Sequence, residues 1–253
     1  MVSWVSTVLQ DTAHRPWPIP ERPWIMLQRW EDLFFAHWPV PVGAVRDLIP
    51  PELEIDTWHG EAWVGVVPFR LTVRPRFTPI LPGISVFPEL NVRTYVKQGD
   101  RTGVWFFSLD ATGRLAIELA RMWFKLPYFR AEMSIITGDQ LRFESERSDR
   151  RGESAQFSMK AQACGDVEFS RPGTLEHWLT ERYSLYTAEN RGRLYKAEVH
   201  HVPWPLQPAE AEFVTNTMTV PLGFELPDTC PLLHYARQLD VVVWNLQRVG
   251  YND

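Results

Sequence analysis

Cysteine is nearly absent from this chain, which has only Cys164 and Cys230 among its 253 residues. The two form no Cys-x-x-Cys pair and no cluster, so neither a disulfide framework nor a thiolate zinc site is indicated. No apolar run approaches the roughly 20 residues that span a bilayer, and the N-terminus lacks a basic stretch followed by an apolar one. We therefore expect two free thiols, no membrane partner and a cytoplasmic location.

An excess of basic residues is also missing. The formal net charge is -5 and the isoelectric point is about 5.8, whereas nucleic acids and anionic surfaces attract proteins with a concentrated basic patch. The one local group of arginines, at 147–151, is interleaved with acidic residues, which favours a solvated hairpin turn. The sequence predicts no nucleic-acid partner.

Phosphate-cradling and nucleophile motifs are absent as well, since the chain has no Gly-x-Gly-x-x-Gly, Walker-type or Gly-x-Ser-x-Gly segment. His-x-His and His-Glu-x-x-His spacings are missing too. His200 and His201 are adjacent, so in a strand their side chains would point to opposite faces, one into the core or a pocket and one to the surface. We predict no cofactor and no metal.

Tryptophan and proline, by contrast, are abundant, with 12 and 21 residues respectively. Prolines break helices and stay at the edges and bends of sheets, which predicts short strands joined by rigid turns. Residues 1–24 form a Trp/Pro-rich N-terminal extension. Its Trp4, Trp17 and Trp24 would be costly to leave in water, so we expect the extension to dock on the protein surface or on a partner.

Apolar periodicity in the remaining residues, 25–253, predicts one β-dominated α+β domain whose sheet is curled into a barrel or cone. A hairpin joins Leu141 and Phe143 to Phe157 and Met159. The predicted strands cover about 31–38, 62–73, 90–97, 103–110, 130–137, 140–147, 154–163, 194–202 and 210–218. Helices are predicted at 42–49, at about 112–124 with Leu115, Leu119, Met122 and Trp123 on one face, and at 175–186, where Thr174 is the N-cap and Trp178, Leu179 and Tyr183 share a face.

The strand at 89–96 has one polar face, because Glu89, Asn91, Arg93 and Tyr95 alternate with apolar residues and Thr94. Two interpretations are open: this face is a solvated outer surface, or it lines an internal cavity. The next strand, Val-Trp-Phe-Phe-Ser-Leu at 104–109, is apolar on both faces, and a strand buried on both sides fits poorly beside a freely solvated one. This neighbour favours the cavity.

Several motifs carry a family resemblance. The runs Glu-Leu-Asn-Val-Arg-Thr-Tyr-Val (89–96), Phe-Phe-Ser-Leu-Asp-Ala (106–111), Leu-Thr-Glu-Arg-Tyr (179–183) and His-His-Val-Pro-Trp-Pro-Leu-Gln (200–207) resemble the YqjF-like family of uncharacterised bacterial proteins. More distantly, the segment at 48–53, Glu89, Leu109-Asp110, Arg121 and Leu126-Pro127 are similar to motifs of the acetoacetate decarboxylase superfamily. The resemblance implies that superfamily's closed β-cone or barrel, with a few peripheral helices around a small-molecule pocket.

The chemistry implied by the superfamily departs from this sequence at one decisive place. Its decarboxylation uses a lysine that forms a Schiff base with a ketone. In the superfamily motif a pair of lysines follows Leu-Pro, and here Tyr128 and Phe129 stand in their place. Tyrosine cannot form an iminium, so acetoacetate decarboxylase activity is not expected. Lys125 matches a glycine of the superfamily motif, which favours a surface position for it.

The remaining polar residues still suit binding or acid–base chemistry. The resemblance implies Glu89 as general acid or base and Tyr128 as donor to a carbonyl, with Arg93 or Arg121 anchoring a carboxylate. For Arg121 the structural alternative is an ion pair with Asp110 or Glu118. The further candidate ligand-binding residues are Asn91, Asp110, His37 and His200.

Two functions are left open by these residues. The first is binding of a small carboxylate or carbonyl compound without a Schiff base. The second is a lysine-independent lyase, hydratase or isomerase that uses Glu89 and Tyr128 as an acid/base pair. A small-molecule ligand is expected in either case, and a homo-oligomer is left open.

Overall fold

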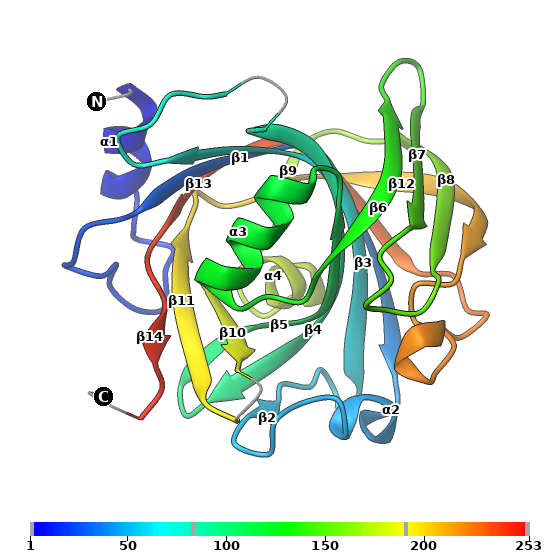
Figure 1. Ribbon diagram of the computed structural model, residues 1–253, viewed down its shortest axis with the longest axis horizontal. Helices are drawn as coiled ribbons and strands as arrows, with labels where there is room; N and C mark the ends of the chain where they lie inside the picture. Colours follow the sequence, from blue (N-terminus) through cyan, green and yellow to red (C-terminus); the bar gives the residue numbers. More distant parts are fainter. Residues whose placement is uncertain (1–2, 82–83, 190–191, 251–253) are drawn as a thin grey trace.

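The computed structural model of the chain describes residues 3–81, 84–189 and 192–250. Strands dominate it, and helices are few and short (Figure 1). The helical elements are α1 (Ser3–Gln10), α2 (Val42–Arg46), α3 (Arg114–Phe124), α4 (Leu175–Thr180) and the 3-10 turn η1 (Val220–Leu222). The strands are β1 (Met26–Val40), β2 (Glu54–Ile55), β3 (Ala62–Pro75), β4 (Val86–Gln98), β5 (Arg101–Ala111), β6 (Tyr128–Ile136), β7 (Leu141–Arg147), β8 (Gln156–Ala163), β9 (Glu168–Phe169), β10 (Ser184–Ala188), β11 (Leu194–His200), β12 (Pro205–Asn216), β13 (Leu232–Val243) and β14 (Gln247–Arg248).

Strand pairing closes the sheet on itself twice. Five strands form a shared wall in the order β13-β1-β3-β4-β5. On one side, β6, β7, β8 and β12 connect β5 back to β13 and complete a ring of nine strands. On the other side, β10 and β11 make the same connection and complete a ring of seven. In Figure 1 the two sets lie on opposite sides of the molecule, at its right and left.

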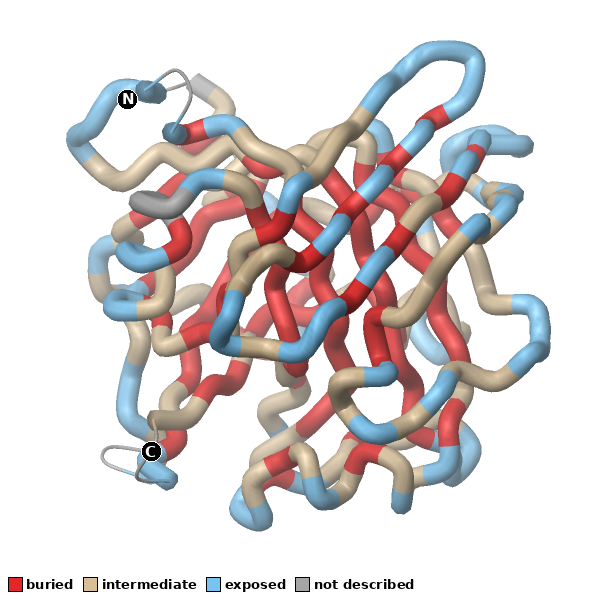
Figure 2. Tube along the Cα trace, turned by 45° about the vertical axis from the view of Figure 1, so that its right-hand side comes forward, coloured by how far each residue is buried: buried red, intermediate tan, exposed pale blue. Residues whose placement is uncertain are grey.

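Alternation along the wall strands divides the core into two parts. On β1, Phe34, Ala36 and Trp38 pack with the nine-strand side, whereas Leu33 and Phe35 pack with the seven-strand side. Successive side chains of a strand point to opposite faces, so a wall with a ring on each side must be apolar on both. Figure 2 shows the result, with buried residues concentrated in the strands and exposed residues in the connections.

Two helices and the N-terminal segment surround the seven-strand ring. Figure 1 shows α3 lying across the ring, with α4 in view behind it. The predicted docking of the N-terminal extension is confirmed, since Val5 and Val8 of α1 pack against Leu27, Val242 and Trp244. The extension docks on the protein's own strands. Among the described residues, no helix is long and apolar enough to cross a membrane.

The predicted strands agree with the structure to within a few residues, and the hairpin pairs Phe143 with Met159. Thr174 caps α4 as predicted, because its hydroxyl accepts a hydrogen bond from the His177 amide at 3.4 Å. The predicted helix at 175–186 is wrong beyond Thr180. There the chain leaves the helix and enters β10, because pairing with β5 and β11 outweighs local helical propensity. Strand β13, at the centre of the fold, was not predicted.

The predicted buried face of the helix at 112–124 is also wrong. Ile117 and Phe124 are the residues of α3 that join the core, whereas Leu119, Met122 and Trp123 are exposed. The side chain of Leu115 lies outside the described part of the chain. The amphipathic pattern located the helix but not the face that packs on the strands, because α3 carries apolar residues on more than one side.

Candidate functional site

A cavity lies inside the seven-strand ring. The space open to the centre of a water molecule is about 100 Å³, several times the roughly 10–15 Å³ that one water needs. Most of the wall is apolar, and its polar side chains come from β1, β4, β6, β10 and the turns after α4 and β11. The lining residues that carry chemistry are Gln28, Glu89, Asn91, Arg93, Tyr128, Arg182, Ser184 and His201.

The polar face of β4 lines this cavity, which settles the two interpretations of that strand. Glu89, Asn91 and Arg93 all contribute to the wall, and the alternate residues Leu90 and Val92 pack in the opposite core. Tyr95, the fourth member of the polar face, is fully buried but lies outside the cavity lining. Strand alternation therefore brings a carboxyl, an amide and a guanidinium to one interior surface.

At one end of this surface, Glu89 and Tyr128 form a direct pair. The Tyr128 hydroxyl donates to Glu89 Oε2 at 3.0 Å, and the Asn91 side chain also hydrogen-bonds the Glu89 carboxyl. Burial raises the pKa of Glu89 from 4.5 to about 8, although both hydrogen bonds oppose this shift. Burial, reinforced by Glu89, raises the pKa of Tyr128 well above 10. At neutral pH the pair therefore holds protons on both groups.

At the other end, Arg93 is a buried cation. Its guanidinium carbon lies 5.4 Å from the Phe35 ring centre and 5.8 Å from that of Tyr95. Among the described residues, Arg93 makes no ion pair with a carboxylate, and its Nε has no hydrogen-bond partner. The Tyr95 side chain hydrogen-bonds Arg93, but this neutral hydroxyl does not balance the guanidinium charge, and a buried charge is normally paired.

Arg182, just after α4, has its counter-ion. Its Nη1 lies 2.5 Å from Asp56 Oδ2, and its Nε donates to the Trp178 carbonyl at 2.6 Å. Its Nη2 lacks a partner among the described residues, as do Asn91 Oδ1 and Ser184 Oγ. With Glu89 protonated, the charges at the cavity sum to a single uncompensated positive charge, that of Arg93. The cavity is therefore electrostatically suited to an anion.

Asp110 and Arg121 lie outside the cavity, which corrects the expectation that they share it with Glu89. Leu109 faces the cavity, so the next residue, Asp110, faces away from it. The Asp110 carboxylate accepts two hydrogen bonds from Arg147 Nε, at 2.9 and 3.2 Å, and one from Nη2 at 2.7 Å. Arg121 Nη1 donates to the Tyr128 carbonyl at 2.5 Å.

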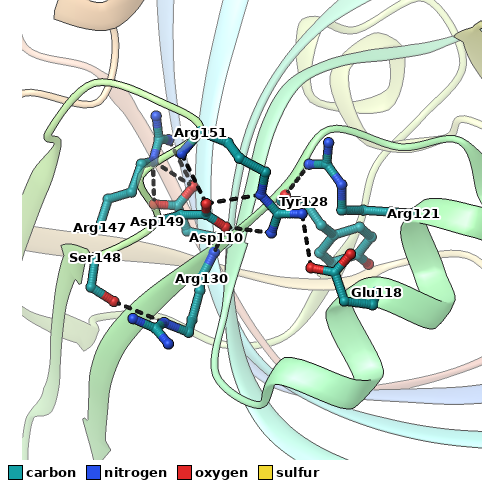
Figure 3. A network of polar contacts seen from close by, with 9 residues as sticks. All are labelled: Asp110, Glu118, Arg121, Tyr128, Arg130, Arg147, Ser148, Asp149 and Arg151. Atoms are coloured by element: carbon teal, nitrogen blue, oxygen red, sulfur yellow. Dashed lines mark hydrogen bonds and ion pairs between the residues drawn. The ribbon is translucent and has the colours of Figure 1, made fainter.

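The predicted alternative partners of Arg121 are also wrong, because Asp110 pairs with Arg147, and Glu118 pairs with Arg151 at 2.8 Å. Figure 3 shows these contacts as one network around the start of β6. Arg151 also contacts Asp149, which accepts the Arg130 backbone amide. The network holds the start of β6; of the residues drawn in it, Tyr128 lines the cavity and the others do not.

His37 contacts the polar face of β4 through Tyr95 without lining the cavity. Its Nε2 is 2.7 Å from the Tyr95 hydroxyl, and burial keeps its pKa well below 6.5, so the ring is neutral. Gly65 makes room for it, since a Cβ there would lie 2.9 Å from His37 Cδ2. His37 therefore packs beside Phe35 and Tyr95, on the same side of β1 as the cavity but outside its lining.

Of the two adjacent histidines, His201 lines the cavity and His200 does not. His200 Nε2 donates to the Val8 carbonyl at 2.8 Å, which corrects its assignment to a ligand site. The expected surface position for one of them is also wrong, because both are buried. The docked N-terminal segment covers the face of β11 that would otherwise be exposed.

No lysine lines the cavity among the described residues. Lys125 forms an ion pair with Glu189 at 2.5 Å and is only partly exposed. The position implied for a Schiff-base lysine is filled by Tyr128, whose phenol points to Glu89. Arg182, Ser184 and His201 were not predicted as site residues. Their polar character was visible in the sequence. They reach β4 only because β10 pairs with β5 and β11 pairs with β13, and both pairings join residues far apart in the chain.

The Glu89 carboxyl predicts a particular pH dependence of stability. Between pH 4.5 and about 8 the folded protein keeps the Glu89 proton while the unfolded chain has lost it. The contribution of Glu89 to the free energy of unfolding therefore falls as pH rises. Glu89→Gln removes this contribution. We expect the unfolding free energy of the variant, relative to the parent, to increase by about 1.4 kcal/mol per pH unit across this window.

Urea denaturation of both proteins at intervals from pH 5 to 8 measures this difference. The subtraction cancels other titrating groups that the substitution leaves unchanged. Glu225→Gln, in a loop away from the cavity, is the matched control and should show no such slope. A Glu89→Gln difference that is constant with pH would mean that Glu89 is ionised in the folded protein at neutral pH.

Comparison with known proteins shows the family of this chain and solved structures of similar fold. A family described as "Uncharacterized conserved protein" matches residues 27–240. The "Uncharacterized protein YqjF" of Bacillus subtilis (strain 168) is 46% identical over 232 residues, covering 91% of this chain and 95% of that protein. These matches confirm the predicted YqjF-like resemblance.

Solved structures resemble the chain at the level of the fold. Acetoacetate decarboxylase from Legionella pneumophila superposes with a TM-score of 0.61 at 13% identity, covering 96% of this chain and 95% of that one. The enduracididine biosynthesis enzyme MppR, complexed with pyruvate, gives 0.60 at 13% identity, with 94% and 95% covered. The predicted acetoacetate decarboxylase-like fold is confirmed.

Proposed function

We propose that this protein, which belongs to the DUF2071 family of uncharacterized conserved proteins, binds a small carboxylate or carbonyl compound inside the seven-strand ring. The observation that carries the proposal is Arg93, a buried guanidinium in the cavity wall without a carboxylate partner among the described residues. A ligand carboxylate would supply the missing counter-charge and accept the hydrogen bond that Nε leaves unmade.

The other polar groups of the cavity support a ligand with a second oxygen function. Glu89 and Arg93 are four residues apart on β4, a Cα separation of about 13 Å, and both side chains reach inward from the same face. Asn91 lies between them, with its Oδ1 unpartnered. A carboxylate at Arg93 would leave a carbonyl or hydroxyl of the same molecule to meet the protonated Glu89 and Tyr128.

Pyruvate, the ligand of the structurally similar MppR complex, has this combination of a carboxylate and an adjacent carbonyl. The shared fold makes small 2-oxo acids the natural first members of a ligand series. No lysine is found in the cavity lining in the part of the chain that the structure describes, which argues against a Schiff base with such compounds.

Isothermal titration calorimetry with acetate, pyruvate, longer 2-oxo acids and the corresponding ketones tests the proposal. We expect carboxylates to bind and the matched ketones, which lack the anion, to bind at least tenfold more weakly. Binding should weaken as pH rises through about 8, because ionised Glu89 repels the ligand anion. Equal affinity for ketones and acids, or no heat with any carboxylate, would contradict it.

A second candidate function is a lysine-independent lyase, hydratase or isomerase reaction. The 3.0 Å contact between Tyr128 and Glu89, together with a Glu89 pKa of about 8, favours it, because a general acid or base works best when its pKa is near the operating pH. Deuterium exchange at the carbon beside the carbonyl of a bound oxo acid, followed by NMR, distinguishes the two functions. Exchange that is lost in Glu89→Gln supports catalysis, whereas binding without exchange supports the binding function alone.

A further inference from the structure

A second hollow adjoins the cavity on its α3 side. It is a groove of about 270 Å³, open to water, between α3 and the segment that links β3 to β4. Its lining is almost entirely apolar. The residues on its rim include Leu81, Ile84, Leu119 and Trp123, which are 46%, 42%, 49% and 47% exposed.

The exposed side of α3 is unusual for a protein surface. Leu119, Met122 and Trp123 follow helical spacing and form an apolar stripe, and Met122 is 73% exposed. Across the groove, Leu81 and Ile84 add to the same patch. Single exposed apolar residues need no explanation, but a contiguous patch around a groove marks a binding surface.

The groove and the cavity share part of their walls. Gln28, Leu71, Phe124 and Tyr128 line both hollows. Only side chains therefore stand between them at this point, and Tyr128 places the junction at the Glu89 end of the cavity. Arg93 lies at the opposite end of the polar face of β4.

From these shared lining residues we infer that the ligand is a carboxylate with an apolar tail. Its carboxylate lies at Arg93, its chain passes Glu89 and Tyr128, and its tail leaves the cavity beside Phe124 to lie in the groove. The inference rests on the proposed function, because the cationic end of the cavity supplies the head-group site. A positive charge inside and an apolar groove outside together complement an amphipathic monocarboxylate.

Straight-chain carboxylates from butanoate to decanoate, kept below the concentrations at which they aggregate, test the inference by calorimetry. Each methylene that becomes buried should strengthen binding by about three- to fourfold. The double variant Ile84→Gln/Leu119→Gln changes two partly exposed groove residues and should weaken decanoate binding about tenfold, with butanoate unaffected. Val214→Gln is the control, at an apolar residue outside the groove that is 60% exposed.

The outcomes separate the two proposals. If no acid of any length binds, the proposed function itself fails. If butanoate binds but affinity does not rise with length, or if decanoate binds the groove variant as well as the parent, only the tail site is overturned. The alternative occupant of the groove is a second copy of the chain, and sedimentation of the parent and the groove variant tests for it. A dimer that dissociates in the variant, with decanoate affinity unchanged, would assign the groove to that second copy.

Discussion

Replacing Arg93 by methionine is expected to abolish carboxylate binding while making the ligand-free protein more stable. The guanidinium is buried without a carboxylate partner among the described residues, so in the free protein its desolvation is not repaid by an ion pair. Methionine keeps much of the volume and removes the charge. We expect the unfolding free energy to rise by about 1–3 kcal/mol and carboxylate affinity to fall by 30-fold or more.

Arg182→Met is the matched comparison, because Arg182 lies in the same cavity wall but is paired with Asp56 at 2.5 Å. Removing it leaves the Asp56 carboxylate without its partner, which costs about 3–5 kcal/mol. Urea denaturation without ligand should therefore give opposite signs for the two variants. Loss of stability in both would show that Arg93 serves the fold and would remove the main support for an anion site.

Asp110→Asn is expected to be the most destabilising conservative substitution considered. Asp110 and Arg147 form a pair whose side chains are 0% and 3% exposed, with three hydrogen bonds between them. The amide leaves Arg147 as a buried cation without compensation, although its guanidinium still lies over the Phe129 ring at 4.3 Å. We expect the unfolding free energy to fall by about 3–5 kcal/mol.

Chemical denaturation measures this loss against Glu118→Gln, which breaks the neighbouring pair with Arg151. That pair is 54% and 41% exposed, and exposed pairs contribute at most about 1 kcal/mol. The double variant Asp110→Leu/Arg147→Met should recover much of the loss, because it leaves no buried charge unpaired. A loss below that of Glu118→Gln would mean that water reaches this pair.

The sequence located most strands of the fold and failed where pairing is non-local. The apolar alternation of β7 and β8 gave their hairpin correctly, because the two strands are adjacent and joined by a short turn. Strand β10 was predicted as the end of a helix, because its register with β5 depends on residues about 80 positions away. Strand β13 was missed even though its last residues are three consecutive valines.

The candidate site shows the same division between local and non-local information. Strand periodicity assigned Glu89, Asn91 and Arg93 to one face. The resemblance singled out Tyr128, because it stands where the acetoacetate decarboxylase superfamily has a lysine. Asp110 could not be assigned correctly by resemblance, although its position next to Leu109 puts it on the opposite face. Arg182 could not be predicted at all, because its approach to β4 depends on the turn between α4 and β10.

The sequence by itself determined a strand-rich fold, one strand with a polar face, and a chain without a lysine at the position that a Schiff base would need. These properties depend on composition and on the two-residue repeat of a strand, which are local. Only the tertiary structure decided that the polar face points into a cavity and that Glu89 meets a tyrosine 39 residues away. It also decided that, among the described residues, Arg93 has no carboxylate partner whereas Arg182 pairs with Asp56. Those outcomes depend on which strands close the seven-strand ring. Pairing between strands far apart in the chain is set by packing on both faces of the shared wall, β13-β1-β3-β4-β5, at once.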